Sequence, residues 1–133
     1  LHALPAADPQ KLRILVAEDD PVLARLILRE LAKEYEVTHA ADGEQAIALA
    51  TENQAFDMVL LDFNMPKVDG LGVLKTLREH HAYKTRPILM LTAVSSDQII
   101  EQAFSAGADD YIVKPYSRRA LLARLRRHLL PDT

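Results

Sequence analysis

The segment "ILVAEDDP", residues 14 to 21, ends an apolar run with three consecutive carboxylates and a proline. Carboxylates packed side by side repel one another and resist burial, so three of them at the end of a hydrophobic strand need water or a cation. Glu18 and Asp19 are the candidate cation ligands. Asp20 followed by Pro21 is instead typical of a helix start, where the aspartate caps the helix and the proline occupies its first position.

Polar side chains also follow three later apolar runs: Asp62, Thr92 and Lys114 stand at their ends. In an open parallel sheet the carboxyl ends of the strands share one edge, and ligands bind there. If the first and third strands are neighbours, Asp19 lies beside Asp62. A hard divalent cation would then relieve the repulsion between the two carboxylates.

These groups together suit a metal ion and a tetrahedral anion. Mg²⁺ prefers oxygen ligands and binds through one or two carboxylates plus phosphate oxygens, so Asp19, Asp62 and a carbonyl just beyond Asp62 can serve, with Glu18 holding a metal-bound water. Lys114 offers a positive charge and Thr92 a hydroxyl donor to the anion. A carboxylate can attack a phosphoryl group to form an acyl phosphate when the charge is neutralised, and Asp62 is the best-placed nucleophile.

Five strand-like segments must position these groups, at residues 12–18, 35–40, 57–62, 86–92 and 109–114. Helical patterns separate and follow them, with expected starts at Asp20, Asp42, Asp69, near Asp97 and at Ser117, and an expected stop at Gly107. In the first helix we expect one apolar face made of Leu23, Leu26, Ile27 and Leu31. Apolar strands separated by helices indicate an α/β protein with a parallel sheet covered on both faces.

The composition fits one ordinary domain. The chain has 133 residues, of which 49% are apolar, and a net charge of -3. This small net charge indicates neither a basic surface for nucleic acid nor a disordered acidic tail. The lack of cysteine excludes disulfides and thiolate metal sites and is compatible with the cytosol. Neither a membrane-spanning apolar stretch nor a signal peptide is visible, so we expect a cytoplasmic domain without membrane insertion.

The first residues, "LHALPAADPQ", begin with leucine and are rich in proline and alanine. We therefore expect residues 1–11 to be an interdomain linker or a remnant of cloning. Residues 12–130 should form one domain and residues 131–133 a tail. We expect the sequence to be a piece of a longer protein.

Four motifs in a fixed order resemble a known family: "AEDD" after the first strand, "LLDFNMPKVDG" around residue 62, "LTA", and "DDYIVKPY" near the end. Each is weak alone, but the ordered set is specific. Over residues 12 to 130 the chain resembles the CheY-like receiver domains of two-component response regulators and hybrid sensor kinases. The resemblance implies a flavodoxin-like fold, a single doubly wound parallel sheet of five strands in the order 2-1-3-4-5, flanked by five helices.

The resemblance also implies the roles of individual residues. Asp62 is the expected phosphoacceptor, Thr92 and Lys114 contact the phosphoryl group, and the Lys114 to Pro115 bond is cis. The expected cofactor is Mg²⁺, held by Glu18, Asp19, Asp62 and the backbone carbonyl of Asn64. The expected switch residues are Thr92 and Tyr111, which stands three residues before Lys114.

The same resemblance implies the partners. The phosphoryl donor would be a histidine kinase or a histidine phosphotransfer protein. Phosphorylation would change the face formed by the fourth helix, fifth strand and fifth helix, which would control an output domain or partner protein. We expect no direct binding of nucleic acid, and no enzymatic activity beyond phosphoryl transfer to and hydrolysis from the domain's own aspartate.

Two other functions are open to such a sequence. A Mg²⁺-dependent phosphohydrolase with an aspartate nucleophile typically carries a second aspartate two positions on, whereas this chain has Asn64, and its acceptor follows the third strand rather than the first. A receiver that only binds partners would not need the intact set of charged residues. The remaining polar groups have simpler expected roles: Asp109 and Asp110 begin a strand and meet solvent or arginines, and the five histidines, His2, His39, His80, His81 and His128, lie at the surface.

Overall fold

The computed structural model describes residues 11–52 and 54–129. All but the last residue of the expected linker, and the expected tail, lie outside the described residues. The strands are β1 (Arg13–Ala17), β2 (Glu36–Ala40), β3 (Met58–Leu61), β4 (Ile88–Thr92) and β5 (Asp110–Val113). The helices are α1 (Pro21–Leu31), α2 (Gly43–Ala50), α3 (Gly70–Glu79), α4 (Asp97–Ser105) and α5 (Arg118–Leu129), with a short 3-10 helix, η1 (His81–Tyr83), that the sequence did not predict.

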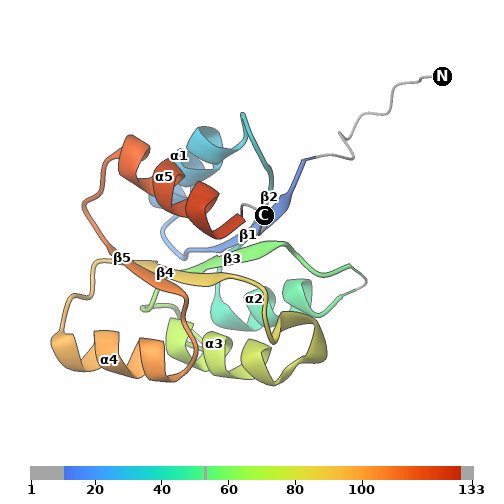
Figure 1. Cartoon of the computed structure of the whole chain (residues 1–133), viewed down its shortest axis with the longest axis vertical. Helices are drawn as coiled ribbons and strands as arrows, with labels where there is room; N and C mark the ends of the chain where they lie inside the picture. Colours follow the sequence, from blue (N-terminus) through green and yellow to red (C-terminus); the bar gives the residue numbers. More distant parts are fainter. Residues whose placement is uncertain (1–10, 53, 130–133) are drawn as a thin grey trace.

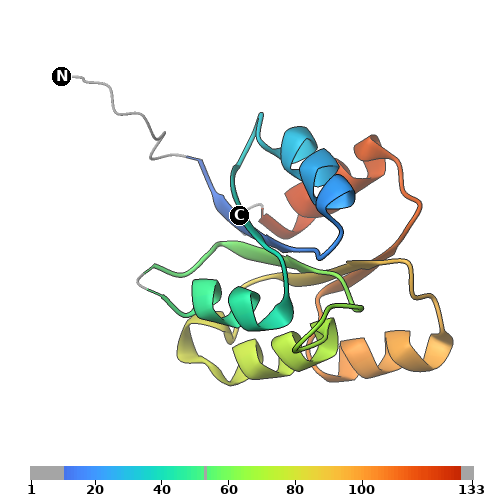
Figure 2. The same ribbon diagram turned by 180° about the vertical axis from the view of Figure 1, so that it is seen from behind.

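The strands form one parallel sheet in the order β2-β1-β3-β4-β5, which confirms the predicted doubly wound α/β fold. Helices α1 and α5 cover one face, and α2, α3 and α4 cover the other (Figures 1 and 2). Along β1, Ile14 packs with the α1 and α5 side, whereas Leu15 packs with the opposite side. Both faces are buried, which is why the strands are apolar throughout rather than alternating.

The predicted caps begin the helices. Asp20, Asp42, Asp69 and Ser117 each accept a hydrogen bond from a backbone N–H in the first turn of the helix that follows. Helix α4 is capped by Ser96 and ends before Gly107, whose φ of 110° lies in the left-handed region. Glycine adopts this conformation at little cost, so it suits the end of a helix.

Helix α1 is rotated relative to the sequence prediction. Its buried residues are Ala24, Ile27 and Leu31, while Leu23 is 36% and Leu26 47% exposed. Successive helical residues lie about 100° apart around the axis, so a helix that points Ala24 and Ile27 at the sheet must turn Leu26 away. The predicted apolar face of four residues was therefore too wide, and Leu23 and Leu26 remain on the surface.

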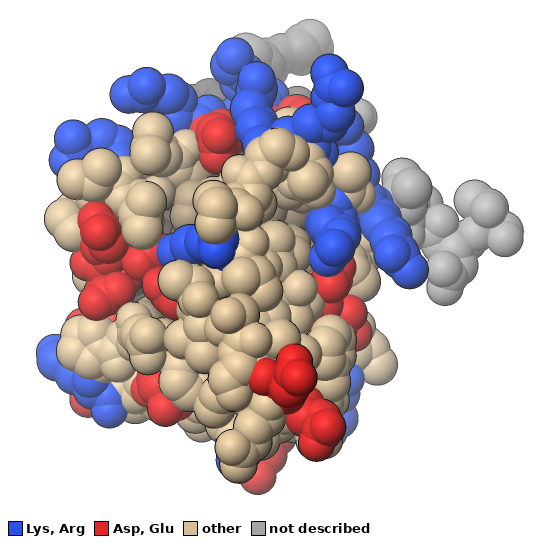
Figure 3. All heavy atoms as spheres, turned by 90° about the vertical axis from the view of Figure 1, so that its left-hand side faces the viewer, with Lys and Arg blue, Asp and Glu red and all other residues tan. Residues whose placement is uncertain are grey.

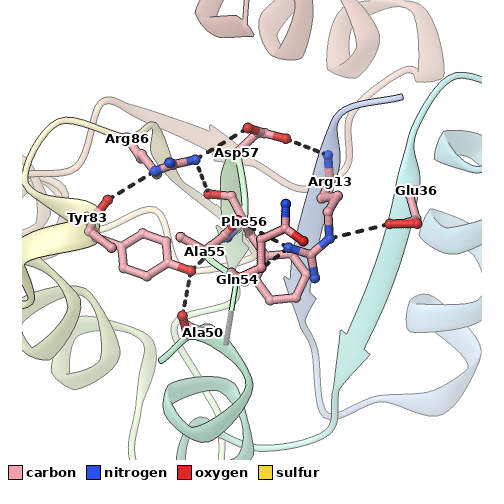
Figure 4. Close-up of polar contacts among 10 residues, drawn as sticks. Arg13, Glu36, Ala50, Gln54, Ala55, Phe56, Asp57, Tyr83 and Arg86 are labelled. Atoms are coloured by element: carbon pink, nitrogen blue, oxygen red, sulfur yellow. Dashed lines mark hydrogen bonds and ion pairs between the residues drawn. The ribbon is translucent and has the colours of Figure 1, made fainter. Parts of the chain in front are cut away.

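A polar network fixes the amino end of β3, opposite the predicted site (Figure 4). The Arg13 guanidinium lies 4.3 Å from the centre of the Phe56 ring. The Asp57 carboxylate accepts from the backbone N–H of Arg13 at 2.8 Å and from the Arg86 guanidinium at 3.3 Å. The Tyr83 hydroxyl accepts from the Phe56 N–H and donates to a carbonyl at the end of α2. These contacts anchor the strand whose other end carries Asp62.

Candidate functional site

The carboxyl ends of β1 and β3 bring three carboxylates together. Oxygen atoms of Glu18, Asp19 and Asp62 all lie within 4.8 Å of one another. The Asp62 N–H donates to the Ala17 carbonyl at 3.0 Å, so the ladder between β1 and β3 continues up to the cluster. The predicted juxtaposition of Asp19 and Asp62 is thus present. Figure 3 faces this end of the molecule and shows acidic side chains gathered beside a basic one.

The cluster is partly buried, which makes its charge costly. Glu18 is only 2% exposed, and 12% of the Asp62 side chain is exposed, whereas Asp19 is exposed. Burial raises the pKa of Glu18, and the Asp62 charge acts in the same direction; hydrogen bonds from Lys114 and from the Asp20 N–H oppose them. A cation held between these carboxylates would therefore stabilise their ionised forms.

Lys114, which follows β5, spans the cluster. Its Nζ lies 2.6 Å from Glu18 Oε1 and 3.5 Å from Asp62 Oδ2. The Lys114 N–H donates to the Thr92 carbonyl at 2.9 Å, and the bond to Pro115 is cis, as expected. The lysine balances part of the acidic charge and lies within reach of a group attached to Asp62.

The two predicted switch residues are linked through Val94. Thr92 is fully buried at the end of β4, and its hydroxyl oxygen lies 3.3 Å from the Val94 N–H that donates to it. Tyr111 is 8% exposed, and its hydroxyl donates to the Val94 carbonyl at 2.6 Å. The Tyr111 side chain is therefore buried. Its hydroxyl and the Thr92 hydroxyl are both hydrogen-bonded to the backbone of Val94.

The backbone behind Asp62 is packed against the start of α3. The Gly70 N–H donates to the Phe63 carbonyl at 2.8 Å, and a Cβ on Gly70 would lie 2.2 Å from the Asp62 carbonyl oxygen. Only glycine permits this approach. Asn64, whose carbonyl was predicted as a ligand, is an exposed residue of the same loop.

Three of the described histidines, His39, His80 and His128, are half-buried rather than at the surface as expected. Two of them contact residues far away in the sequence. His39 is half-buried on β2, and its Nε2 lies 2.7 Å from the Glu18 carbonyl oxygen. His128 is half-buried on α5 and contacts the Asp110 carboxylate at 3.1 Å. Neither contact follows from a spacing pattern, because each joins segments far apart in the sequence. The expectation that Asp109 and Asp110 meet arginines is confirmed, with Arg78 and Arg124 as the partners.

An apolar groove of about 490 Å³ adjoins the site on the α1 side. It is lined by Leu23, Leu26, Ile27, Glu30, Ala93, Lys114, Pro115 and Tyr116. The two exposed leucines of α1 therefore border a groove that reaches Lys114. Basic side chains gather over α1 and α5, above the acidic cluster in the view of Figure 3.

Known proteins resemble this chain in sequence and fold. The model of the response regulator receiver domain family matches residues 14–126. The chain is 42% identical over 115 residues to the DNA-binding dual master transcriptional regulator RpaA of Synechocystis, and 40% identical over 114 residues to the transcriptional regulatory protein SrrA of Staphylococcus aureus. These matches cover 86% and 85% of this chain but 47% and 46% of the relatives. The chain thus spans about half the length of these relatives.

Solved structures agree. Chemotaxis protein CheY4 of Vibrio cholerae superposes with a TM-score of 0.84 at 34% identity, covering 90% of this chain and 99% of that one. The receiver domain of a sensor histidine kinase from Pseudomonas aeruginosa, with a magnesium ion coordinated in its active site cleft, superposes with a TM-score of 0.82 at 35% identity, covering 90% and 98%. With its matching sequence and fold and its cluster of carboxylates, the chain belongs to the receiver domain family of two-component response regulators.

Proposed function

We propose that this domain accepts a phosphoryl group on Asp62 from a phosphohistidine donor in the presence of Mg²⁺. The observation that carries the proposal is the convergence of three carboxylates within 4.8 Å, with Lys114 Nζ 3.5 Å from the acceptor. The donor set consists of hard oxygen atoms and fits Mg²⁺. Glu18, Asp19, Asp62 and the Asn64 carbonyl would hold the ion.

The transfer would use the side chains that follow β1, β3, β4 and β5. An Asp62 carboxylate oxygen attacks phosphorus, the bond from phosphorus to the donor's imidazole nitrogen breaks, and an acyl phosphate and a free histidine result. Mg²⁺, if held by these carboxylates, would neutralise part of the negative charge of the transferred group. Lys114 adds a fixed positive charge beside the acceptor, and the Thr92 hydroxyl donates to a phosphoryl oxygen.

The donor would contact α1. Leu23 and Leu26 are exposed beside the groove that reaches Lys114, and Arg25 and Arg29 are exposed on the same helix. This arrangement fits a partner with an apolar patch bordered by acidic side chains, because such a border complements the arginines. A histidine kinase or a histidine phosphotransfer protein with that surface would bring its phosphohistidine to the edge of the sheet.

The domain would work as the regulated part of a longer cytoplasmic signalling protein. RpaA and SrrA are transcriptional regulators about twice the length of the match, and a sensor histidine kinase also carries a similar domain. In either setting the signal would leave through the face formed by α4, β5 and α5. Within the described residues, no helix has the length and apolar character required to cross a membrane.

Phosphorylation with acetyl phosphate tests the proposal. Intact-mass spectrometry should detect one added phosphoryl group in the wild-type protein with Mg²⁺, and none after chelation. Asp62→Asn should remain unlabelled, whereas Asp20→Asn, which keeps the helix cap next to the cluster, should be labelled like the wild type. Full labelling of Asp62→Asn, or labelling that chelation does not reduce, would overturn the assignment.

A further inference from the structure

The peptide between Glu18 and Asp19 is held by the neighbouring strand β2. The Glu18 N–H donates to the Ala40 carbonyl at 3.0 Å, and His39 Nε2 lies 2.7 Å from the Glu18 carbonyl oxygen. A carbonyl oxygen can only accept a hydrogen bond, so Nε2 carries the proton and His39 is the donor. Both polar groups of the Glu18 backbone are therefore bonded to consecutive residues of β2.

The carbonyl contact sets the direction of Asp19. A peptide unit is planar, so the orientation of the Glu18 carbonyl also sets the positions of the Asp19 nitrogen and Cα. Asp19 is exposed, and it precedes Asp20, whose side chain caps α1. The bond from His39 thus orients the peptide from which the Asp19 carboxylate extends toward the cluster.

We propose that His39 is a positioning residue for the metal site. By donating to the Glu18 carbonyl it fixes the peptide that joins two of the three clustered carboxylates, and so prepares them to bind a divalent cation. His39 itself touches neither the ion nor the phosphoryl group. The inference rests on the proposed Mg²⁺ site. It gives the edge strand β2 a role in shaping that site, although β2 contributes none of the predicted ligands.

The test compares two substitutions at one position. His39→Leu removes the donor, whereas His39→Gln keeps a side-chain N–H that can reach the carbonyl. We expect His39→Leu to weaken Mg²⁺ binding about tenfold, the lower end of the effect seen when groups that orient metal ligands are removed. His39→Gln should bind Mg²⁺ much more like the wild type. Calorimetric titration of the protein with MgCl₂ alone, at one fixed pH, measures both affinities.

A matched variant separates positioning from general stability. Val37 lies two residues before His39 on β2, packs at the edge of the core and makes no contact with the Glu18 carbonyl among the hydrogen bonds of the described residues. Val37→Ala should lower the free energy of unfolding while leaving Mg²⁺ affinity unchanged. If His39 only stabilised β2, His39→Leu would behave in the same way, and the inference would be wrong.

Phosphorylation kinetics give a second readout. With acetyl phosphate, His39→Leu should need a higher Mg²⁺ concentration for half-maximal labelling but reach the wild-type rate at saturating Mg²⁺. Equal loss in the leucine and glutamine variants would exclude the hydrogen bond as the cause and overturn the inference. Wild-type protein that neither binds Mg²⁺ nor becomes labelled would overturn the proposed function as well, so the two failures are distinguishable.

Discussion

Asp19 and Asp20 are adjacent but have different roles. Asp19 joins the carboxylate cluster, whereas the Asp20 side chain accepts hydrogen bonds from the Val22 and Leu23 N–H groups. Asp19→Ala should therefore abolish Mg²⁺ binding in a calorimetric titration. Asp20→Ala should retain binding and lose about 0.5 to 2 kcal/mol of unfolding free energy in urea, the usual cost of a lost helix cap. Loss of Mg²⁺ binding in both variants would contradict this division.

Asp110 should make the domain sensitive to acid. Burial on its own raises the pKa of Asp110, but hydrogen bonds from the Tyr111 N–H, His128 and Arg124 outweigh it, and the pKa falls below the ordinary value of 3.8. A lowered folded-state pKa contributes stability that is present above the unfolded value and is lost as pH falls through the folded one. As pH falls below about 4, the unfolding free energy of the wild type should therefore decrease. The decrease should be smaller in Asp110→Asn, which has no carboxylate to protonate at this position. Urea unfolding at several pH values measures it, and identical pH profiles would refute the assignment.

Residue types at strand ends made most of the clustering at the candidate site predictable. Glu18, Asp62 and Lys114 each follow an apolar run, and the parallel sheet brings such ends to one edge. The contacts of His39 and Gly70 were not predictable in the same way. They depend on distances between backbone segments that are separated in sequence, and neither residue type carries a pattern that indicates its partner.

The helices and strands themselves were largely predictable, because caps and apolar runs are local signals. Asp20, Asp42 and Asp69 begin helices as their sequence contexts indicated. The rotation of α1 was not predictable, since it is set by packing against the sheet and α5 rather than by the helix's own sequence. The short helix η1 also depends on a distant contact: its residue Tyr83 is buried and bonded to the segment before β3.

A substitution at the start of α3 tests how this helix supports the backbone of Asp62. Gly70→Ala would place a methyl group 2.2 Å from the Asp62 carbonyl oxygen, so the loop carrying Asp62 must shift. We expect a loss of about 1 to 3 kcal/mol of unfolding free energy, as for other overpacked sites, and slower labelling by acetyl phosphate.

Gly72, two residues further along α3, is the matched control for that variant. A Cβ there would meet mainly the Val68 side chain, at 2.8 Å, and a side chain can move more easily than backbone. Alanine is also the better helix former, by about 1 kcal/mol. Gly72→Ala should therefore keep wild-type labelling and near wild-type stability. Similar behaviour of the two variants would show that the contact with Asp62 does not matter.

At the scale of the whole molecule, the site and the proposed output face share β4 and β5. Thr92 ends β4, and Tyr111 on β5 belongs to the same buried cluster as Ala103 of α4. Phe104, also on α4, is exposed. The Val94 backbone accepts from Tyr111 and donates to Thr92. A movement of Thr92 toward a phosphoryl group on Asp62 would therefore disturb the residue to which Tyr111 is bonded.

Beryllofluoride with Mg²⁺, which mimics the acyl phosphate, tests this coupling by NMR. Because the Tyr111 hydroxyl bonds to the Val94 carbonyl, amide shift changes in the wild type should extend from Asp62 and Thr92 to residues 99–116. Tyr111→Phe removes that hydrogen bond but keeps the ring, so the changes near Asp62 should persist while those on α4 and β5 become smaller. Changes confined to the neighbours of Asp62 in the wild type would mean that the domain binds the mimic without transmitting a switch. A ligand shifts an equilibrium between two conformations only if it binds one of them more tightly than the other. Equal shift changes in the wild type and Tyr111→Phe would show that the two conformations are coupled to the site by contacts other than the bond to Val94.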